Sequence, residues 1–329
     1  MRAFGRTGLQ VSILGFGCGA VGGLMVRGTP ADQERAVARA LEAGVNYFDT
    51  AVQYGNGESE KNLGRILAKL KPDVVLGTKV RIPAEEFGRI EAAVTESMNG
   101  SLQRLGREQV DIFHLHNQIA TVGGGDRLSV KQVLDEVVPA FQKLRDQGKL
   151  RVLGITADGD TPALHQVLDS GAFTSAQVIY NMLNPSAATA LPVGYPAQDY
   201  DRLFEHTEAA GVGVVGVRVL AGGALSGVAE RHPIASPPPP PMGSASSYDG
   251  DLARARRLMP LVQQGHAASL VEAAVRFAIS HEAMGTILVG VATVEELDQT
   301  LAAVHKGPLS EAALDSLAEL QRGFVGEGR

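Results

Sequence analysis

Four ionisable side chains in the first half of the chain are of the types that could together move a proton to or from an oxygen atom: Asp49, Tyr54, Lys79 and His116. A tyrosine hydroxyl has an unperturbed pKa of about 10, which is too high for ready proton exchange at neutral pH. A lysine ammonium beside it would favour the phenolate, and a carboxylate paired with that lysine would hold the ammonium in place. We therefore predict that Tyr54 is a general acid and base for a carbonyl or alcohol oxygen, with His116 donating a hydrogen bond to the same oxygen.

The surroundings of these four residues exclude several other chemistries. No good covalent nucleophile accompanies them and no metal-ligand spacing occurs, so no metal site is expected. The one cysteine, Cys18, excludes a disulfide framework, and we expect it to be a small buried hydrophobic residue or to line a pocket. Carbonyl chemistry with a tyrosine acid needs a source of hydride, which implies a nicotinamide cofactor.

Asp49, Lys79 and His116 each stand at the end of a short apolar run, and such runs alternate with amphipathic segments. Short apolar runs are typical of parallel strands covered on both faces. Because groups at strand ends gather at the C-terminal face of a parallel barrel, we expect these side chains to meet there. His114 should lie in the interior, one layer below. The predicted strands cover residues 13–17, 47–50, 74–79, 110–116, 152–156, 177–180, 212–217 and 286–289.

The segments between the strands have the end signals of helices. Pro30 suits a first helical turn, Ser310 suits a cap, and glycines stand just past several helix ends. Eight strands alternating with such helices give either a barrel or a doubly wound sheet. The predicted helices cover residues 30–43, 58–70, 86–105, 130–147, 162–168, 200–210, 252–264, 270–280, 294–304 and 310–322.

One region, residues 232–250, breaks this alternation with five consecutive prolines and a serine- and glycine-rich stretch. The prolines favour an extended rod and the residues after them a flexible segment. A domain linker is one interpretation. We favour a long loop after the seventh strand of one domain covering residues 1–329, because one more strand follows. We expect this loop to be a lid that closes over bound cofactor or substrate.

The segment Gly17-Cys18-Gly19-Ala20-Val21-Gly22 formally matches the G-x-G-x-x-G signature of a Rossmann turn. That turn would open a helix directly and be followed by an acid about 20 residues on. Here Pro30 delays the helix, and Asp49 is too distant. We interpret the segment as a tight turn where backbone approaches a ligand or another loop.

Composition limits the partners. The 329 residues are 44% hydrophobic and carry a net charge of -6, which allows a large core and argues against nucleic acid. No apolar leader occurs, and the most apolar stretch, residues 211–225, is interrupted by Arg218 and too short to cross a bilayer. No membrane partner and a cytosolic location are therefore expected. With no tryptophan and 5% aromatic residues, a small aldehyde, ketone or sugar is a better substrate than a densely aromatic one.

The motifs Phe48-Asp49-Thr50-Ala51-x-x-Tyr54-Gly55, Thr78-Lys79 and Asp111-x-x-x-x-His116 resemble those of the aldo-keto reductase superfamily. The resemblance continues through Gly154-Ile155-Thr156, Gln177-x-x-Tyr180-Asn181, residues 220–225 and Gly290-x-x-Thr293. It implies a (β/α)8 barrel that binds NAD(P)(H) without a Rossmann fold and interconverts an aldehyde, ketone or aldose with the alcohol or lactone. It also implies an Asp-Tyr-Lys-His tetrad. The alternative is a non-catalytic, cofactor-binding regulatory subunit of the same fold, against which the intact tetrad argues.

The resemblance also implies the cofactor contacts, with some departures. Thr156-Ala157 replaces a common Ser-Asn pair, and Val217-Arg218 stands where an aromatic residue often stacks on the nicotinamide. Arg218 is either a pyrophosphate ligand or a solvated or ion-paired arginine. Many members use NADP(H), but Glu296 stands where an arginine is often found, so we expect tolerance of NAD(H). The implied contacts are Gly19, Thr156, Gln177, Arg218, Leu220, Gly222, Gly290, Ala292, Thr293 and Glu296.

Overall fold

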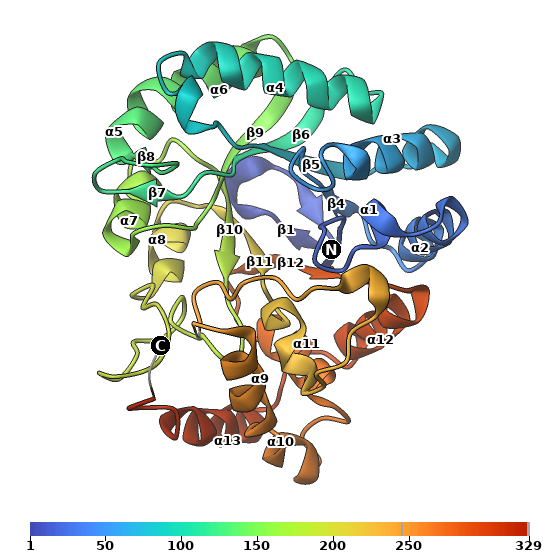
Figure 1. Ribbon diagram of the computed structural model, residues 1–329, viewed down its shortest axis with the longest axis vertical. Coiled ribbons are helices and arrows are strands. Elements are labelled where there is room, and N and C mark those ends of the chain that lie inside the picture. The colour runs from blue at the N-terminus through green and yellow to red at the C-terminus, as the bar shows by residue number, and fades with distance from the viewer. Residues whose placement is uncertain (245, 328–329) are drawn as a thin grey trace.

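Eight parallel strands close into a barrel in the computed structural model, which describes residues 1–244 and 246–327 (Figure 1). The last strand pairs with the first, Ile287 beside Leu14, so the sheet has no open edge. This closure confirms the predicted (β/α)8 barrel and excludes the doubly wound sheet. In order around the barrel the strands are β3 (Leu14–Gly17), β4 (Tyr47–Asp49), β5 (Val75–Val80), β6 (Val110–Leu115), β9 (Leu150–Thr156), β10 (Ser175–Ile179), β11 (Gly213–Val217) and β12 (Met284–Gly290).

Helices surround the barrel, and their ends carry the signals expected from the sequence. Thr29 accepts a hydrogen bond from the backbone N–H of Asp32 and is followed by Pro30 in the first turn of α2. Gly106 ends α4 in the left-handed conformation. The helices connecting the strands are α2 (Pro30–Glu42), α3 (Glu58–Leu70), α4 (Ile90–Leu105), α5 (Val130–Gln132), α6 (Val138–Asp146), α7 (Thr161–Asp169), α8 (Leu203–Ala209) and α12 (Val294–His305).

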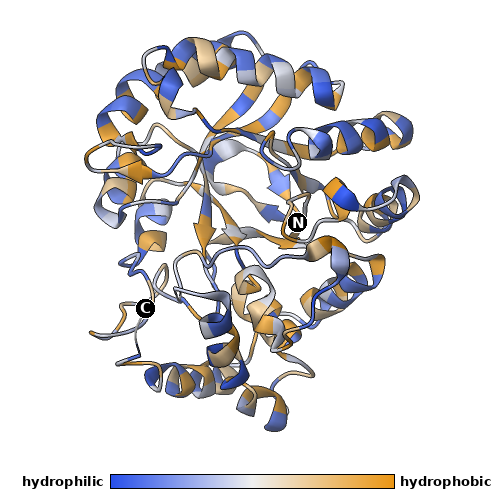
Figure 2. Cartoon of the chain, in the orientation of Figure 1, coloured by the Kyte–Doolittle hydropathy of each residue, from blue (hydrophilic) through white to orange (hydrophobic). Residues whose placement is uncertain are grey.

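Five further helices lie outside the simple alternation: α1 (Leu24–Arg27), α9 (Tyr248–Arg256), α10 (Pro260–Gln263), α11 (Leu270–Ala278) and α13 (Glu311–Arg322). Ser310 caps α13, as predicted, by accepting a hydrogen bond from the N–H of Ala313. The outer faces of the helices are largely hydrophilic, and hydrophobic residues concentrate toward the barrel (Figure 2). Among the described helices, none combines the length and apolar character needed to cross a membrane.

Most predicted helices agree with the structure to within three residues at each end, but three segments differ further. Within the predicted helix at 86–105, α4 begins only at Ile90, after a separate 3-10 turn (Ala84–Glu86). Residues 130–147 contain a π-helical turn (Val133–Val137) just before Pro139, whose ring nitrogen cannot donate to the preceding turn. The predicted helix at 252–264 divides into α9 and α10. Because Ser247 caps α9 through the N–H of Gly250, the loop predicted over residues 232–250 ends at Ser247.

A hairpin that the sequence did not predict closes the N-terminal end of the barrel. It consists of β1 (Arg2–Ala3) and β2 (Gln10–Val11), with Phe4 fully buried between them and the strands. A Cβ atom added at Gly213 would lie 2.6 Å from the Phe4 ring, so the glycine makes room for this side chain. At the opposite end, β7 (Ile119–Ala120) and β8 (Leu128–Ser129) form a small parallel pair after β6.

Candidate active site

The ammonium of Lys79 joins three of the four residues singled out from the sequence. Lys79 projects from β5, is fully buried, and is paired with Asp49 Oδ1 at the end of β4. Its Nζ also donates to the backbone oxygen of Thr50 at 2.9 Å and to the Tyr54 hydroxyl at 3.2 Å. The structure therefore brings Asp49, Lys79 and Tyr54 together at the C-terminal ends of the strands.

The second carboxylate oxygen of Asp49 is also occupied. Oδ2 accepts hydrogen bonds from the Tyr47 hydroxyl at 3.1 Å and from Gln177 Nε2 at 2.7 Å. Sequence reasoning missed Tyr47, although it lies two residues before Asp49 and so on the same face of β4. The amide nitrogen of Gln177, a residue predicted to contact the cofactor, donates to this carboxylate, and this bond orients the whole side chain at the cavity wall.

Burial and the neighbouring charges act in opposite directions on the pKa values of Tyr54 and Lys79. Burial raises the pKa of Tyr54, and Lys79 lowers it, with a net rise above the ordinary value. Burial lowers the pKa of Lys79, but the charges and hydrogen bonds of Asp49 and Tyr54 raise it above its ordinary value. Lys79 thus lowers the pKa of the Tyr54 phenol, as predicted, but by less than burial raises it. Tyr54 is a neutral phenol at neutral pH.

His116 is the fourth member and lies beside Tyr54, with ring centroids 6.0 Å apart and the rings edge to face. Burial, with smaller contributions from Lys79 and Arg81, lowers the pKa of His116 to about 3. The imidazole is therefore neutral, with one N–H to donate. Its Nδ1 is 3.3 Å from Gln53 Oε1, a partner that the sequence did not indicate. His114 is fully buried beside Ser175, 2.9 Å from its hydroxyl, as expected for an interior residue.

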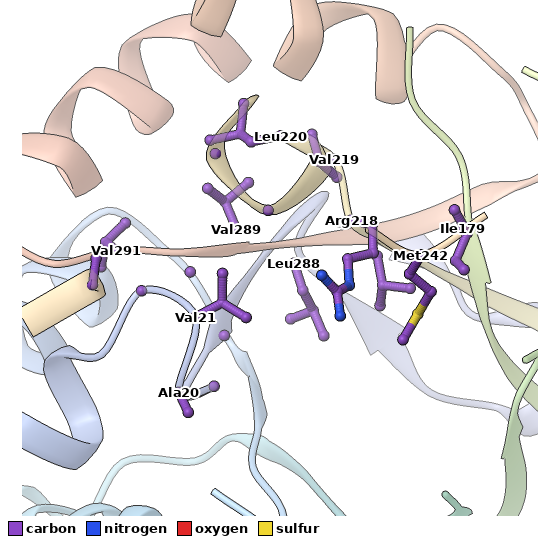
Figure 3. A pocket seen from close by; sticks show the side chains of 18 of the residues that line it. Ala20, Val21, Ile179, Arg218, Val219, Leu220, Met242, Leu288, Val289 and Val291 are labelled. Atoms are coloured by element: carbon purple, nitrogen blue, oxygen red, sulfur yellow. The ribbon is translucent and has the colours of Figure 1, made fainter. Parts of the chain in front are cut away.

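A cavity of about 720 Å³ opens over these residues, and Asp49, Tyr54 and His116 form part of its wall. One wall is aliphatic, with Val21, Leu220, Val289 and Val291 around the space (Figure 3). Of the residues that the family resemblance implied, Ala292 and Thr293 do not line the cavity. The others all do: Gly19, Thr156, Gln177, Arg218, Leu220, Gly222, Gly290 and Glu296.

Ala292 and Thr293 instead fix the start of α12 and, with it, Glu296. Thr293 caps the helix by accepting from the N–H of Glu296 at 3.2 Å. The carboxylate of Glu296 turns back and accepts from the N–H of Ala292 at 2.7 Å. These reciprocal bonds hold a carboxylate at the N-terminus of a helix beside the cavity.

The turn after β3 passes close to the end of β12. A Cβ atom added at Gly22 would lie 2.3 Å from the backbone nitrogen of Val291, and one at Gly17 would lie 3.2 Å from the oxygen of Val289. Gly19 faces the Tyr54 ring. The sequence predicted a tight turn here, where backbone approaches a ligand or another loop, and the close approach to β12 agrees with that prediction. No helix of the Rossmann type opens directly from the turn. Cys18 lies within the turn, fully buried and outside the cavity wall, and burial raises the pKa of its thiol.

Arg218 follows β11 with a positive φ of 58° and points into the cavity near Met242 and Leu288 (Figure 3). Burial lowers its pKa, while the neighbouring charges of Tyr54 and Asp158 act in the opposite direction. Its Nη1 is 3.5 Å from the oxygen of Pro240. The guanidinium thus lies on the side of the cavity that contains Tyr54.

Residues 232–244 and 246–247, here called the strap, lie across one side of the cavity between η4 (Ala221–Ser226) and α1. The predicted loop also includes Ala245, which lies outside the described residues. At one end Arg231 donates to the oxygen of Gly222 at 2.7 Å. Further along, Arg27 donates to the oxygen of Ile234 at 2.5 Å and to that of Ala20 at 2.6 Å. The strap contains a 3-10 turn (Pro233–Ala235) and contributes Ala235 and Met242 to the cavity wall.

This cavity fits a dinucleotide. Several glycines line it and expose backbone to it, its aliphatic wall suits a planar ring, and a helix N-terminus at α12 suits a phosphate or ribose. A solvent-shielded phenol next to an ammonium, at the same cavity, suits proton exchange with a carbonyl or alcohol oxygen.

A closed barrel with this site at its C-terminal face is the architecture of an oxidoreductase family, and comparison with known proteins identifies it. Residues 13–322 match the model of the Aldo/keto reductase family, and the chain belongs to that family. It is 30% identical to L-galactose dehydrogenase of Arabidopsis thaliana over 92% of this chain and 88% of that protein. It is 28% identical to D-threo-aldose 1-dehydrogenase of a Pseudomonas species over 58% of this chain and 64% of that protein.

Among solved structures, the fold is similar to that of aldo-keto reductase AKR11C1 from Bacillus halodurans in its holo form. The TM-score is 0.72 and the sequence identity 24%, over 97% of this chain and 95% of that one. This likeness agrees with the barrel described above. Together the comparisons assign the protein to a family of oxidoreductases that act on aldehydes, ketones or aldoses.

Proposed function

We propose that the protein is an NAD(P)-dependent aldose dehydrogenase that oxidises the anomeric alcohol of a sugar to a lactone and, with the reduced cofactor, reduces small aldehydes to alcohols. The observation that supports this most strongly is the Tyr54 hydroxyl at the cavity wall, 3.2 Å from the buried ammonium of Lys79. Two sugar dehydrogenases among the relatives support an aldose as substrate.

In the proposed mechanism Tyr54 Oη exchanges a proton with the reacting oxygen of the substrate. In oxidation the hydroxyl proton passes to the phenolate, and in reduction the phenol returns it. Lys79 stabilises the phenolate, and Asp49 holds the ammonium, with Tyr47 and Gln177 fixing the carboxylate. Because Nδ1 of His116 lies 3.3 Å from Gln53 Oε1, an acceptor, the single proton of the neutral ring lies on Nδ1, and Nε2 can accept a hydrogen bond from a hydroxyl of the substrate.

The nicotinamide cofactor, when bound, accepts or supplies the hydride. Gly19, Gly22 and Gly222 line the cavity and would present backbone to the cofactor, and Leu220 and Val291 would pack against its apolar parts. Gly290 and Glu296 lie where the strand end meets α12. Thr156, on β9, offers a hydroxyl to the carboxamide, although that hydroxyl donates to the oxygen of Leu115 in this structure. Arg218 points into the cavity, where its guanidinium is available to bind the pyrophosphate of the cofactor or the substrate.

The direct test is turnover by the purified protein of a panel of aldoses with NAD⁺ and NADP⁺, and of small aldehydes with the reduced cofactors. We expect oxidation of at least one aldose with a defined KM, with formation of the lactone detected by its hydrolysis to the acid. Cofactor binding without turnover of any aldose or aldehyde would contradict the proposal and favour a regulatory subunit.

Glu296 is expected to set the cofactor preference toward NADH. A 2′-phosphate carries close to two negative charges at neutral pH. At about 4 Å from a carboxylate it is destabilised by a few kcal/mol at an effective dielectric near 20. Glu296→Arg should therefore raise kcat/KM for NADPH relative to NADH by roughly tenfold or more, the change that corresponds to about 1.4 kcal/mol.

Two further variants separate the effect of the Glu296 charge on cofactor preference from the structural role of this side chain at the start of α12. Glu296→Gln keeps an acceptor for the N–H of Ala292 without the charge and should give an intermediate ratio. Glu295→Arg changes the exposed neighbour in the same helical turn, outside the cavity wall, and should leave the ratio nearly unchanged. A strong wild-type preference for NADPH that none of these variants alters would show that the phosphate binds elsewhere.

The strap is expected to open for cofactor exchange and to be protected when cofactor binds. Hydrogen exchange should slow by roughly tenfold or more at the amides of Ile234, Ala235 and Met242 on addition of cofactor, because bound cofactor disfavours local opening. Pro237–Pro241 have no exchangeable amide N–H, so exchange is measured at the residues on either side of them. Helix α13 serves as an internal reference that should not change. Equal exchange with and without cofactor would contradict a lid.

A further inference from the structure

Part of the cavity wall is polar. Arg81, Gln118, Asp126, Asp158 and Arg218 all contribute to it. Arg81 and Asp126 pair with each other at the exposed mouth, but Asp158 lies deeper and is only partly exposed. Neither the proton transfer nor the cofactor contacts proposed above use Asp158, so its presence in the wall of the same cavity as Tyr54 and His116 needs another explanation.

The backbone holds Asp158 firmly in this position. Its carbonyl oxygen accepts from the N–H of Ile119 on β7 at 2.9 Å, and Asp160 donates to the oxygen of Ile119 at 2.8 Å. Between them Gly159 has a φ of +135°, and a Cβ atom there would lie 1.9 Å from the Ile119 oxygen. Only glycine allows this approach, and the result is a rigid loop that directs Asp158 from the end of β9.

The carboxylate of Asp158 has one partner and one open acceptor. Gln118 Nε2 donates to Oδ2 at 3.2 Å. Within residues 1–244 and 246–327, Oδ1 accepts no hydrogen bond and no ion pair forms at N–O distances within 4.0 Å. The positive charges of Arg218, Arg127 and Arg81 act on Asp158 from a distance, against the effect of burial, which raises its pKa. The side chain is thus a half-satisfied acceptor facing the cavity.

A partly buried carboxylate with an open acceptor requires donors from the molecule that fills the cavity. A sugar supplies them, since each of its hydroxyls can donate to a carboxylate and accept from an amide or a guanidinium. An aldehyde without hydroxyls would displace water from Asp158 without donating a hydrogen bond in its place, and the unsatisfied carboxylate would make binding unfavourable. An anionic substrate would meet a like charge. The arrangement therefore favours neutral, polyhydroxylated substrates.

We propose that Asp158, oriented by Gln118, is the residue that recognises the hydroxyl groups of the substrate, with Arg218 donating to the same groups. This inference rests on the proposed aldose dehydrogenase activity and adds the source of its substrate preference. Asp158 acts by binding and does not take part in proton transfer at the reacting oxygen.

The test compares Asp158→Asn with the wild type on two kinds of substrate: an aldose with its deoxy analogues, and a small aldehyde without hydroxyls, such as propanal. We expect KM for the aldose to rise about ten- to a hundredfold with kcat changed less than about threefold, as loss of hydrogen bonds to a charged group predicts. One deoxy analogue should lose affinity in the wild type but not in the variant. Propanal reduction should be nearly unchanged.

Asp160→Asn is the matched control. Asp160 lies two residues further along the same loop, pairs with Arg127 and is outside the cavity wall, so its loss should leave KM for the aldose unchanged. Asp158→Glu, which restores the charge, should recover part of the aldose affinity. Thermal unfolding of each variant checks that the loop remains folded.

The possible failures are distinguishable. If the wild type oxidises no aldose and reduces no aldehyde, the proposed function is wrong. If the wild type is active and Asp158→Asn lowers aldose and propanal turnover equally, or raises the KM of the cofactor alone, the proposed role of Asp158 is overturned. Equal affinity of the wild type for the aldose and all its deoxy analogues would also overturn it.

Discussion

Tyr54→Phe is expected to lower kcat for both oxidation and reduction by about a thousandfold, within the range found for loss of a positioned general acid or base. The variant should fold normally, because the only hydrogen bond that the hydroxyl makes among the described side chains is the one from Lys79, which keeps Asp49 and Thr50 as partners. Cofactor affinity, measured by fluorescence titration, should be nearly unchanged. Comparable turnover by the variant and the wild type would contradict an acid and base role for Tyr54.

The pH dependence of oxidation and reduction, compared between the wild type and Tyr54→Phe, provides a second test of this role. Because the pKa of Tyr54 is raised above its ordinary value of about 10, the phenol remains protonated across neutral pH. Reduction, which needs the phenol, should be constant through neutral pH and fall only in strong alkali, whereas oxidation, which needs the phenolate, should rise with pH. His116, with a pKa of about 3, should contribute no inflection above pH 5. Tyr54→Phe should remove the rise in oxidation.

Asp49→Asn is expected to lower the free energy of unfolding by about 3–5 kcal/mol, because it leaves the fully buried ammonium of Lys79 without its carboxylate. The new amide would also meet two donors, Tyr47 and Gln177, where the carboxylate accepted from both. Activity should fall with it, since the ammonium next to Tyr54 is no longer fixed. Urea unfolding followed by circular dichroism, together with steady-state rates, measures both effects.

A double variant separates the two effects. Asp49→Asn with Lys79→Met removes both charges, and replacing a buried pair with uncharged groups is often close to neutral. The double variant should therefore be more stable than Asp49→Asn and equally inactive. Asp298→Asn, which breaks the exposed pair with Arg39, serves as a control and should change stability little. If the double variant unfolds at no higher urea concentration than Asp49→Asn, the uncompensated charge is not the cause of the instability.

The fold could be predicted from the sequence to the level of its elements, because the strands of a parallel barrel are continuous apolar runs. The N-terminal hairpin could not, since strands of two residues have no periodicity to detect. The π turn before Pro139 follows from the missing donor of the proline, but its position depends on how α6 packs. The start of α9 at Tyr248 has a cap, Ser247, within a serine-rich stretch where several serines were equally suitable.

The candidate site was predictable where residues stand at strand ends, as Asp49, Lys79 and His116 do. Tyr47 and Asp158 obey the same geometry and could have been found by it: one shares the face of Asp49, and the other follows the end of β9 by two residues. Gln53 could not, because its side chain lies in a turn whose shape depends on tertiary contacts. The contact between Gln177 and Asp49 spans 128 positions and follows from barrel closure alone.

Because Cys18 is fully buried, we expect the protein not to react with thiol reagents. The thiolate is the reactive form, and a thiol that is enclosed and holds its proton neither alkylates nor oxidises readily. Because Cys18 is the one cysteine of the chain, a cysteine introduced on the surface becomes a unique attachment point for a spectroscopic label without any prior removal of native thiols. Two such cysteines, one on the strap and one on α3, would then report the opening of the cavity as a change in a single distance.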